Sequence, residues 1–397
     1  MANSCKIVFI KCYDFPLGGA SQNRTISLCK GLVNCSNKVE IHIFGPGKRN
    51  LDLNKIRHQY YQNIEIFNHS AIFVPCTSKF KQFIGLIYGL ILTIFSVIFS
   101  NMKNKISYIF LGNSDLLYII IFWLICKLIG AKLVRELNEY PKYLIRNEDN
   151  IIKYSVIDKI KYKFFDVFVF ITTNLLNYYT PLVKRKHKSI IIPMTVDTDR
   201  FDKLLPIELR DPYLITYCGD LSQNKDGTLS LIKAFYLLAS QNEKYKLQLI
   251  GSNNDLNVIK NVITLINQLK LENRVILSGY MHPDKIPEAL MKSSVLVLCR
   301  PNNKQAEGGF PTKLGEYLAS GVPVVVTSVG EIPLYLKHKE TAFLCEPDDI
   351  ESFYNTLNYV ILNYEEAIEV GLRGRELAYN IFSYKIQGKI LSDFLIS

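Results

Sequence analysis

The chain has 397 residues, of which 48% are hydrophobic and 21% charged. This composition can bury large cores, which excludes a disordered or fibrous chain, and the length favours two domains of about 150–200 residues each. Residues 1–193 hold 26 basic and 11 acidic residues (net +15), and the remainder holds 21 and 25 (net −4), which together give +11. A cationic half favours a polyanionic partner such as nucleic acid, anionic lipid or a phosphorylated substrate. A compositional bias toward Lys, Asn and Ile is the alternative explanation of the charge.

Strand-like and helix-like segments alternate through the first half. Apolar runs predict strands at 6–15, 39–45, 64–68 (IEIFN), 71–75 (AIFVP), 106–112, 131–137, 166–172 and 189–194. The turn PLGGASQNR follows the first strand and leads into a helix that ends near Val33, and another helix is expected at 116–129. Strands that alternate with helices predict a parallel sheet built from β–α–β units.

One apolar segment in this half, FIGLIYGLILTIFSVIFS (83–100), contains no charge. As a helix it would be roughly 27 Å long, just under the thickness of a bilayer core, and it contains a G-x-x-x-G pattern. Three interpretations compete: a buried helix, a helix that lies on a membrane surface, and a membrane span. A span is disfavoured because the strand-like segments on both sides are expected to belong to one sheet. The helix is flanked by lysines on both sides, Lys79, Lys81, Lys103 and Lys105.

The second half repeats the alternation. Strands are expected at 213–221, 246–252, 274–279, 294–300 and 322–330, with helices at 227–239, 255–270, 284–293 and 312–320 and a loop at 301–311. The two halves predict two doubly wound α/β domains in series, divided near 196–212. In such folds ligands bind at the carboxyl ends of the strands, which here means a deep cleft between the domains.

Several common motifs are absent. The chain has no G-x-G-x-x-G, P-loop, G-x-S-x-G or H-E-x-x-H pattern, so nothing supports an NAD enzyme, an ATPase, a serine hydrolase or a zinc protease. Its nine cysteines form no C-x-x-C pair and no zinc spacing, and most have apolar neighbours. Buried reduced thiols and an N-terminus without a signal-peptide pattern predict a cytosolic location.

The most informative segment is RPNNKQAEGGFPTKLGEYLASGVPVVVTSVG (300–330). A polar loop follows a strand, Pro311 opens the helix 312–320, and Gly321 ends it before a buried strand. The free backbone amides at the start of the helix, from Thr312 onward, form an anion site that the helix dipole strengthens.

Four residues add to this anion site. Gly308 and Gly309 allow a ligand to approach the backbone closely, and Lys313 adds a formal charge. Glu316, one turn further along, can accept hydrogen bonds from a neutral polyol such as ribose. The set predicts a site for a phosphate joined to a sugar. The alternative is a solvated loop capped by a helix.

This segment resembles the donor-binding signature of the retaining glycosyltransferases of family 4, which have the GT-B fold. In that family the helix carries a Glu for the donor ribose, which matches Glu316. A second Glu, eight residues earlier, contacts the donor sugar; it falls on Gly308 here, with Glu307 one residue before it. Either Glu307 substitutes through a shifted backbone or the contact is lost. The pattern GFPTK-L-x-EYLASG-x-PVVV, which contains Gly309 and Phe310, is itself similar to bacterial members.

A second stretch, CGDLSQNKDGTLSLIKAF (218–235), resembles another phosphate-binding element of the family. Lys225 fits the Lys of that element, whereas its Arg falls on Asp220. Arg300, at the end of a strand that faces the same cleft, is the candidate to supply the missing cation. A surface arginine is the alternative.

Two further elements extend the resemblance over nearly the whole chain. PLGGASQNR resembles the N-terminal glycine loop, in which Gly18 and Gly19 would let backbone amides approach the donor diphosphate. IPMTVDTDRF (192–201) resembles the family's interdomain segment, with Thr195 where Gly is usual.

The segment RELNEYP (135–141) follows a strand end in the first half. Members of the family often carry a His near the position of Glu136 that contacts the reacting sugar, and Glu139 lies about a turn later. These two carboxylates are candidates to orient an acceptor hydroxyl or to stabilise cationic charge on the sugar. Solvated loop charges are the alternative interpretation.

The resemblance implies an acceptor-binding domain at 1–195, a donor-binding domain at 196–380 and a C-terminal helix at 381–397 that packs back on the first domain. It implies transfer of a sugar from a nucleotide diphosphate sugar to a hydroxyl with retention, in cell-surface polysaccharide synthesis, without metal or cofactor. The catalytic candidates are Glu136, Glu139, Lys225 and Glu316. Candidates for donor binding are Gly18, Gly19, Lys225, Arg300, Glu307, Gly309, Phe310, Thr312, Lys313 and Glu316.

The cationic, apolar first half leads to the hypothesis that the acceptor is lipid-linked and that the protein lies peripherally on the inner face of the cell membrane. Basic clusters at 153–163 and 184–188 are further candidate lipid contacts, with a solvated surface as the alternative. A nucleotide-sugar 2-epimerase and a non-catalytic GT-B-like subunit that binds a nucleotide sugar or lipid remain open. Nucleic-acid binding is disfavoured because no aromatic platform accompanies the basic residues.

Overall fold

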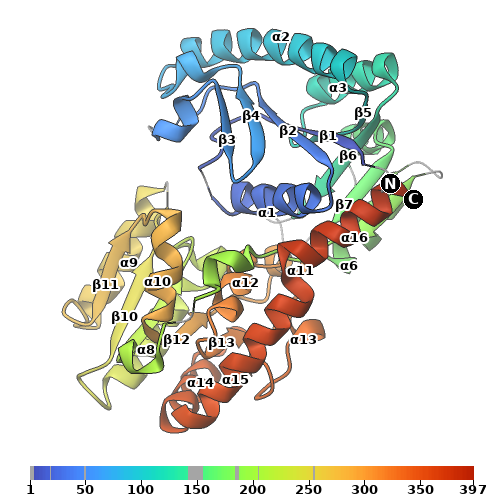
Figure 1. The fold of residues 1–397 in the computed structure, drawn as a ribbon. Coiled ribbons are helices and arrows are strands. Elements are labelled where there is room, and N and C mark those ends of the chain that lie inside the picture. The colour runs from blue at the N-terminus through green and yellow to red at the C-terminus, as the bar shows by residue number, and fades with distance from the viewer. Residues whose placement is uncertain are drawn as a thin grey trace. The chain divides into compact units, whose positions relative to one another are not determined.

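The computed structural model describes residues 4–17, 19–48, 51–141, 155–183, 187–203, 205–253 and 255–397. Within these ranges the chain forms two compact units. The first unit holds residues 4–139, 155–195 and 384–397, and the second holds residues 140–141 and 196–383. Each unit is an α/β body built around its own sheet (Figure 1).

The sheet of the first unit has strand order β3-β4-β2-β1-β5-β6-β7-β8. Its paired neighbours run parallel, except that β3 runs antiparallel to β4. Central strands such as KIVFIK are buried on both faces, which is the pattern that a parallel sheet covered by helices requires. The strands are β1 (Lys6–Lys11), β2 (Lys38–Ile43), β3 (His58–Tyr61), β4 (Ile64–Asn68), β5 (Ile106–Leu111), β6 (Lys132–Leu137), β7 (Val167–Phe170) and β8 (Lys188–Ile191).

Helices cover both faces of this sheet, with α2 and α3 on one side and α1 and α16 on the other (Figure 1). The helices are α1 (Ala20–Asn34), α2 (Lys79–Lys103), α3 (Leu116–Ile129), α5 (Val156–Lys161), α6 (Thr173–Tyr179) and α16 (Tyr384–Ile396). Short 3-10 turns are η1 (Asp52–Lys55), η2 (Ala71–Phe73), η3 (Tyr162–Phe164) and η4 (Thr180–Leu182).

The sheet of the second unit has strand order β11-β10-β9-β12-β13-β14 and is parallel throughout. Its strands are β9 (Asp211–Cys218), β10 (Lys246–Ile250), β11 (Val275–Gly279), β12 (Ser293–Leu298), β13 (Val324–Thr327) and β14 (Phe343–Cys345). Its helices are α7 (Gln223–Asp226), α8 (Thr228–Ala239), α9 (Leu256–Gln268), α10 (Ile286–Met291), α11 (Lys304–Gly308), α12 (Thr312–Ala319), α13 (Ile332–Tyr335), α14 (Ile350–Leu362) and α15 (Tyr364–Leu377). Short turns are η5 (Thr198–Phe201), η6 (Ile207–Leu209), η7 (Pro283–Lys285) and the π-helical η8 (Ala378–Phe382).

The prediction of two doubly wound α/β domains is confirmed by these two sheets. In the first unit the strand order reverses between β1 and β5, and in the second unit it reverses between β9 and β12. The loops that leave the carboxyl ends of such strand pairs diverge and leave room for a ligand. The loops after β9 and β12 are therefore where the fold of the second unit places a site.

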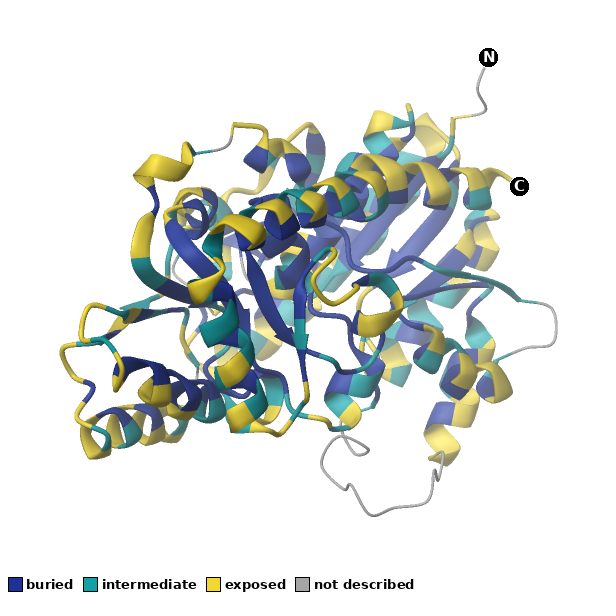
Figure 2. Cartoon of the chain, turned by 90° about the horizontal axis from the view of Figure 1, so that it is seen from below, coloured by how far each residue is buried: buried dark blue, intermediate teal, exposed yellow. Residues whose placement is uncertain are grey.

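The strands form the core of each unit, and the helices expose their outer faces. Figure 2 shows the central strands mostly in the buried class, whereas helices alternate between buried and exposed residues. The edge strands β3, β8 and β11 are partly exposed. In the first unit one apolar cluster joins β1 and β2 to helices α1 and α16, through residues such as Phe9, Leu28 and Leu391, each 1% exposed or less. The C-terminal helix is thus part of the core of the first unit.

Four local predictions differ from the structure. The segment AIFVP is not a strand: η2 forms there because the Phe73 and Val74 amides donate back to Ser70 and Ala71. The first strand ends at Lys11 rather than at residue 15, and the predicted loop 301–311 contains α11. The strand β3 was not predicted, because its hairpin turn uses Gln62 and Asn63 with positive φ instead of a common Asn-Gly pair.

Candidate functional site

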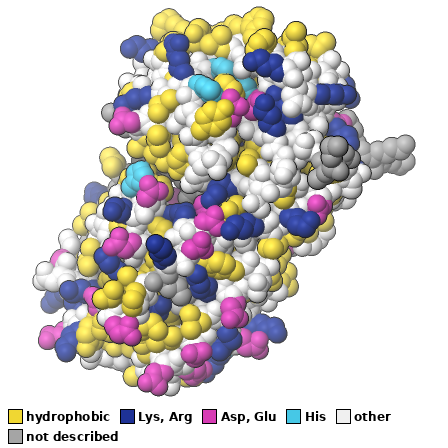
Figure 3. Space-filling view, in the orientation of Figure 1, with side chains coloured by type: hydrophobic (Ala, Val, Ile, Leu, Met, Phe, Trp, Pro, Cys, Tyr) yellow, Lys and Arg dark blue, Asp and Glu magenta, His cyan; other side chains and the backbone are white. Residues whose placement is uncertain are grey.

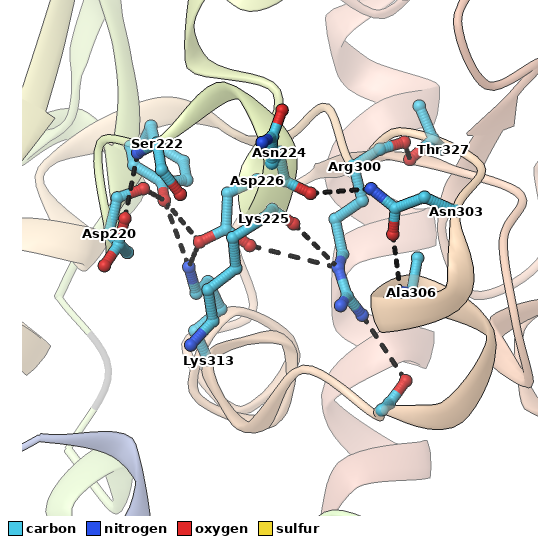
Figure 4. A network of polar contacts seen from close by, with 12 residues as sticks. Asp220, Ser222, Asn224, Lys225, Asp226, Arg300, Asn303, Ala306, Lys313 and Thr327 are labelled. Atoms are coloured by element: carbon cyan, nitrogen blue, oxygen red, sulfur yellow. Dashed lines mark hydrogen bonds and ion pairs between the residues drawn. The ribbon is translucent and has the colours of Figure 1, made fainter. Parts of the chain in front are cut away.

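The loops after β9 and β12 meet at one buried carboxylate in the second unit. Asp226 ends α7, which follows β9, and its side chain is 1% exposed. Arg300 follows β12, and its Nε lies 3.9 Å from Asp226 Oδ1. Lys313, in the first turn of α12, donates from Nζ to Asp226 Oδ2. Two cations therefore share one buried anion, as Figure 4 shows.

A tyrosine hydroxyl completes this cluster. The Tyr217 hydroxyl oxygen lies 3.1 Å from Lys313 Nζ, 2.7 Å from Asp226 Oδ2 and 2.5 Å from the Asp220 carbonyl oxygen. A hydroxyl has one proton, so Tyr217 accepts from Lys313 and donates to one of the two oxygens at a time. Burial raises the pKa of Tyr217 and the charge of Asp226 raises it further, which keeps the group a neutral donor.

The electrostatics of the cluster leave a positive charge in excess. Burial by itself would raise the pKa of Asp226, but the charges of Lys313 and Arg300 outweigh it, and the pKa lies below its ordinary value of 3.8. Asp226 is therefore a carboxylate at neutral pH and balances one of the two cations. The remaining charge lies at the carboxyl edge of the sheet, which suits the binding of an anion.

Arg300 is a buried residue rather than a surface arginine, with 4% of its area exposed. Besides Asp226, it contacts two backbone carbonyls, from Nε to Lys225 O at 3.4 Å and from Nη1 to Gly309 O at 3.5 Å. Its own carbonyl accepts from Thr327 Oγ1 at 2.8 Å. Arg300 thus connects α7, which carries the half-buried Lys225, to the loop before α12.

The first turn of α12 is fixed against β9. Pro311 is the N-cap residue, Thr312 begins the helix, and no acidic residue stands in the first turn. The amide of Cys218, the last residue of β9, donates to the Tyr317 hydroxyl at 2.6 Å. This bond and the Lys313 contacts hold the positive end of the helix dipole beside the cluster.

Phe310 and Gly309 precede this helix, and both are buried. The Phe310 side chain is 4% exposed and packs against Tyr335 and Phe382, with ring centroids at 5.3 and 5.8 Å. Its predicted role in donor binding is therefore restricted to its backbone. Gly309 is buried, and its amide donates to Gln305 O at 3.1 Å.

Glu316 lies one turn into α12 and forms an ion pair with Arg200 of η5, from Nη1 to Oε1. Arg200 also donates from Nη2 to the Pro283 carbonyl at 2.5 Å. Burial by itself would lower the pKa of Arg200, but the charge of Glu316 outweighs it and the pKa is raised. A polyol that approaches Glu316 therefore meets a carboxylate already oriented by a cation.

Glu307 and Gly308 contact Tyr140, a residue of the second unit. The Tyr140 hydroxyl donates to Glu307 Oε1 at 3.2 Å, and Lys304 Nζ lies 2.6 Å from Glu307 Oε2. A Cβ atom added to Gly308 would lie 2.5 Å from Tyr140 Cδ2, closer than real contacts allow. The tyrosine ring therefore occupies the space that a side chain at position 308 would need.

The glycine loop of the first unit lies at the start of α1. Gly18 lies outside the described residues, and Gly19 is the N-cap residue of α1. The Gly19 amide donates to Gln22 Oε1 at 2.9 Å. A cavity of about 180 Å³ opens beside this loop at the carboxyl ends of β1 and β5, lined by Lys11, Cys12, Tyr13, Phe15, Ser21, Gln22, Thr25 and Gly112.

Glu136 and Glu139 lie in different environments. Glu136 Oε1 accepts from Arg24 Nε at 2.6 Å, and Arg24 also donates to the carbonyls of Pro193 and Ile192. Burial would raise the pKa of Glu136, but Arg24 outweighs it and the pKa is lowered, so the group stays ionised. Glu139 is exposed. The structure thus gives Glu136 a structural partner in the first unit.

The residues of this site that sequence reasoning missed are Asp226, Tyr217, Arg200 and Tyr140. Asp226 directly follows Lys225 in the quoted stretch 218–235, and Arg200 stands in IPMTVDTDRF, but no local pattern connects either to its partner. Among the described residues no group of three or more His, Cys, Asp or Glu is placed to hold a metal ion.

Known proteins share sequence similarity with parts of this chain, including much of the second unit, which contains this site. Residues 212–363 match the family model described as "Glycosyl transferases group 1". N-acetyl-alpha-D-glucosaminyl L-malate synthase of Bacillus anthracis is 29% identical over 164 residues, which are 41% of this chain and 39% of that protein. The putative colanic acid biosynthesis glycosyltransferase WcaL of Escherichia coli is 25% identical over 214 residues, 53% of this chain and 51% of that protein. The matches thus span two-fifths to one-half of these curated relatives.

A solved structure matches the chain over a longer range. The crystal structure of Anabaena HepE in complex with UDP and glucose superposes with a TM-score of 0.71, covers 99% of this chain and 100% of that one, and is 17% identical. At this identity the likeness shows the fold, which is GT-B. Residues 212–363 are thus similar to the glycosyl transferases group 1 family, and the chain has the GT-B fold.

Proposed function

We propose that this protein transfers a sugar from a nucleotide diphosphate sugar to a hydroxyl group of a glycan acceptor. The observation that carries the proposal is the pairing of Arg300 and Lys313 with Asp226 beside the first turn of α12. The family match covers this region, and the solved structure of similar fold contains UDP. A uridine diphosphate sugar is therefore the first donor to test.

The leaving group of this reaction is a nucleoside diphosphate, so negative charge develops on its phosphates in the transition state. Preorganised cations and amides stabilise such charge without reorganisation at the moment of reaction. Lys313 and the start of α12 at Thr312 would contact the phosphates, Lys225 would approach from α7, and Glu316 would bind the ribose. Because Asp226 holds Lys313 in place before the donor binds, the site would need little rearrangement.

For the acceptor side, we propose a lipid-linked glycan in cell-surface polysaccharide synthesis at the inner face of the cell membrane. The cationic first unit and the polysaccharide-related names of relatives support this assignment. Glu136, kept ionised by Arg24, would orient the acceptor hydroxyl or stabilise cationic charge on the sugar. We propose retention of configuration by front-face attack, with the departing phosphate oxygen as the base.

A thermal-shift panel tests the donor site. The full-length protein is measured with UDP, GDP, ADP, CMP and their common sugar conjugates. At 100 times the dissociation constant a ligand stabilises the folded state by about 2.7 kcal/mol, which gives a clear shift. We expect one diphosphate nucleotide and its sugar conjugate to stabilise the wild type, and Lys225→Ala and Glu316→Gln to reduce that shift.

Lys260→Ala, at an exposed position in α9 of the same unit, is the matched control and should keep the full shift. The stabilising conjugate is then incubated with lipid-linked oligosaccharides, and the anomeric configuration of the product is determined by NMR. A folded wild type that no nucleotide stabilises would contradict the donor site. Binding without transfer would favour a non-catalytic subunit, and an altered sugar without acceptor would favour an epimerase.

A further inference from the structure

The helix α2 exposes large apolar side chains along one face. Phe80 is 72% exposed, Phe95 68% and Met102 78%. The exposed apolar residues of α2 recur with each helical turn, three or four residues apart, so they lie on the same side of the helix. Figure 3 shows hydrophobic side chains gathered along the upper edge, where Figure 1 places α2. The exposed apolar face of α2 consists of Phe80, Phe83, Ile84, Ile87, Tyr88, Ile91, Phe95, Phe99 and Met102.

The opposite face of α2 packs on the first unit through a stripe of small residues. Gly85, Gly89, Thr93 and Val97 are the buried residues of the helix, spaced four apart. A Cβ atom added to Gly89 would lie 2.0 Å from the Phe44 carbonyl oxygen, so the helix backbone lies directly against the chain after β2. The stripe holds α2 lengthwise on the unit.

The C-terminal part of α2 is also held by polar contacts. The Ser100 hydroxyl donates to Glu40 of β2, and the Ser100 carbonyl accepts from Lys6 Nζ of β1 at 2.9 Å. The ammonium of Lys6 forms an ion pair with Glu40 at 2.9 Å, and both side chains are at most 4% exposed. Breaking such a buried pair is costly, so this end of the helix stays attached to the sheet.

The charged residues in the stretch of sequence that contains α2 have one sign. No acidic residue occurs between Glu65 and Asp115, that is, throughout 66–114. The lysines in this stretch flank both ends of α2 and are exposed. They are Lys79, Lys81, Lys103 and Lys105.

The neighbouring helix α3 adds to this surface. It contacts α2 and lies beside it (Figure 1). Its exposed leucines, Leu117, Leu124 and Leu128, are 55–74% exposed, and Lys127 is exposed among them. The apolar area of the first unit therefore extends beyond one helix. Contiguous exposed apolar surface of this kind marks an interaction site.

We propose that α2 lies flat at the interface of an anionic membrane, with its exposed apolar face at the acyl boundary and its flanking lysines on lipid phosphates. The proposal deepens the membrane location given under the proposed function and names the surface that produces it. Membrane binding through this face requires neither donor nor catalysis, because the apolar face and its flanking lysines are exposed in the protein without nucleotide.

A lipid surface fits this face better than a second copy of the chain does. Lysines stand at both ends of α2, so two copies packed through this face would bring cationic ends together in either the parallel or the antiparallel orientation. Like charges at close range oppose such packing. An anionic lipid surface instead satisfies all four lysines at once.

Among the described residues, α2 is the one helix long and apolar enough to cross a membrane, with a mean hydropathy of 2.3 in its most apolar window. A transmembrane orientation would have to detach the stripe from Gly85 to Val97 and the Ser100 contacts from the unit. The flat orientation keeps these contacts and buries only the face that is already exposed.

Vesicle flotation of the full-length protein without nucleotide or sugar tests the proposal. The vesicles are pure phosphatidylcholine or an equal mixture of phosphatidylcholine and phosphatidylglycerol. We expect binding to the anionic vesicles, and the double variant Phe95→Ser/Phe99→Ser should weaken it by roughly a hundredfold, about tenfold for each buried ring. The variant Lys103→Gln/Lys105→Gln should weaken binding to anionic vesicles about thirtyfold and leave binding to neutral vesicles unchanged.

The matched control is Leu256→Ser/Leu362→Ser, which removes two leucines that are 81% and 74% exposed in the second unit. This variant should bind within about twofold of the wild type, as expected for surface positions outside the contact. Circular dichroism confirms that each variant is folded. If the phenylalanine variant does not fold, the lysine variant carries the test by itself.

Three results would overturn the proposal. The first is undiminished vesicle binding by a folded phenylalanine or lysine variant. The second is a concentration-dependent dimer in sedimentation that Phe95→Ser/Phe99→Ser abolishes, which would assign the face to a second copy. The third is bound protein that cannot transfer to fresh vesicles, which would indicate a membrane span. None of these results bears on nucleotide binding, so failure here is distinguishable from failure of the proposed reaction.

Discussion

At the scale of single residues, the chain differs from the motif that it resembles at position 308, where a glycine packs against Tyr140. The family carries a sugar-contacting Glu at the position of Gly308. Here the tyrosine ring fills that space and its hydroxyl donates to Glu307. Burial raises the pKa of Tyr140 and the charge of Glu307 raises it further, so the hydroxyl keeps its proton at neutral pH. The residue pair explains why Gly stands at position 308.

Restoring the family residue by Gly308→Glu should destabilise the protein, because the new side chain collides with the tyrosine ring. We expect a loss of about 1–3 kcal/mol in the free energy of unfolding, as for other overpacked sites. Tyr140→Ala in the same chain should recover part of this loss, with a coupling energy of about 1–2 kcal/mol. Urea unfolding of the two single variants and the double variant measures the coupling.

The control for this cycle pairs Gly308→Glu with Tyr280→Ala, a tyrosine of the second unit that is 49% exposed. Those two substitutions should add within about 0.5 kcal/mol. If Gly308→Glu and Tyr140→Ala are equally additive, the ring does not determine the residue at position 308.

The sequence predicted separate residues of the candidate site better than their contacts. Lys225, Lys313 and Glu316 were identified from local motifs, because a helix start and its first turn form a local pattern. The partner of Lys313 is Asp226, 87 residues earlier, and the partner of Glu316 is Arg200, 116 residues earlier. Such pairs depend on the order of strands in the sheet, which no single segment contains.

At the scale of elements, α16 is joined to α1 by a contact between two glycines. A Cβ atom added to Gly388 would lie 2.2 Å from the Cα of Gly31, so the two helix backbones touch. The Tyr108 hydroxyl donates to the Leu395 carbonyl near the end of α16. This helix follows the second unit in the sequence and belongs to the core of the first unit.

Gly388→Ala should therefore weaken the first unit, since the added methyl group meets backbone atoms that cannot rotate away. We expect the free energy of unfolding to fall by about 2–3 kcal/mol, at the upper end for overpacking. Lys389→Ala, at the next and exposed position of the helix, should change it by less than about 0.5 kcal/mol. Urea unfolding of both variants makes the comparison, and equal stability of Gly388→Ala and wild type would contradict the glycine contact.

Elements were predictable where a single segment determines its own structure. Parallel strands such as β1 and β12 are buried on both faces, so they stand out as continuous apolar runs. The helix α2 was recognised from its apolar run, but its ends at Lys79 and Lys103 lie in polar sequence beyond that run. The strand β3 depends on pairing with β4, and a pairing of this kind leaves little trace in four residues.

At the scale of the whole molecule, net charge and the proposed binding partners are divided between the two halves of the chain. Residues 1–193 carry a net charge of +15 and the remainder carries −4. The basic residues near α2 are exposed, whereas Arg300 in the second unit is buried beside Asp226. Dissolved salt ions therefore screen the exposed lysines of the proposed membrane contact more strongly than the buried charges of the proposed nucleotide site.

Salt should therefore separate the two binding activities. The Debye length falls from about 8 Å at physiological ionic strength to about 3 Å at 1 M, which screens exposed lysines far more than buried cations. Raising sodium chloride over that range should lower binding to anionic vesicles by at least about tenfold, because each lysine near the surface contributes about 1 kcal/mol. The thermal shift produced by the binding nucleotide should keep most of its size, since Arg300 and Asp226 are shielded from solvent. Flotation and thermal shift on one preparation make the measurement, with neutral vesicles as the control. Equal losses in both assays would show that the nucleotide site is as open to solvent as the lysines that flank α2.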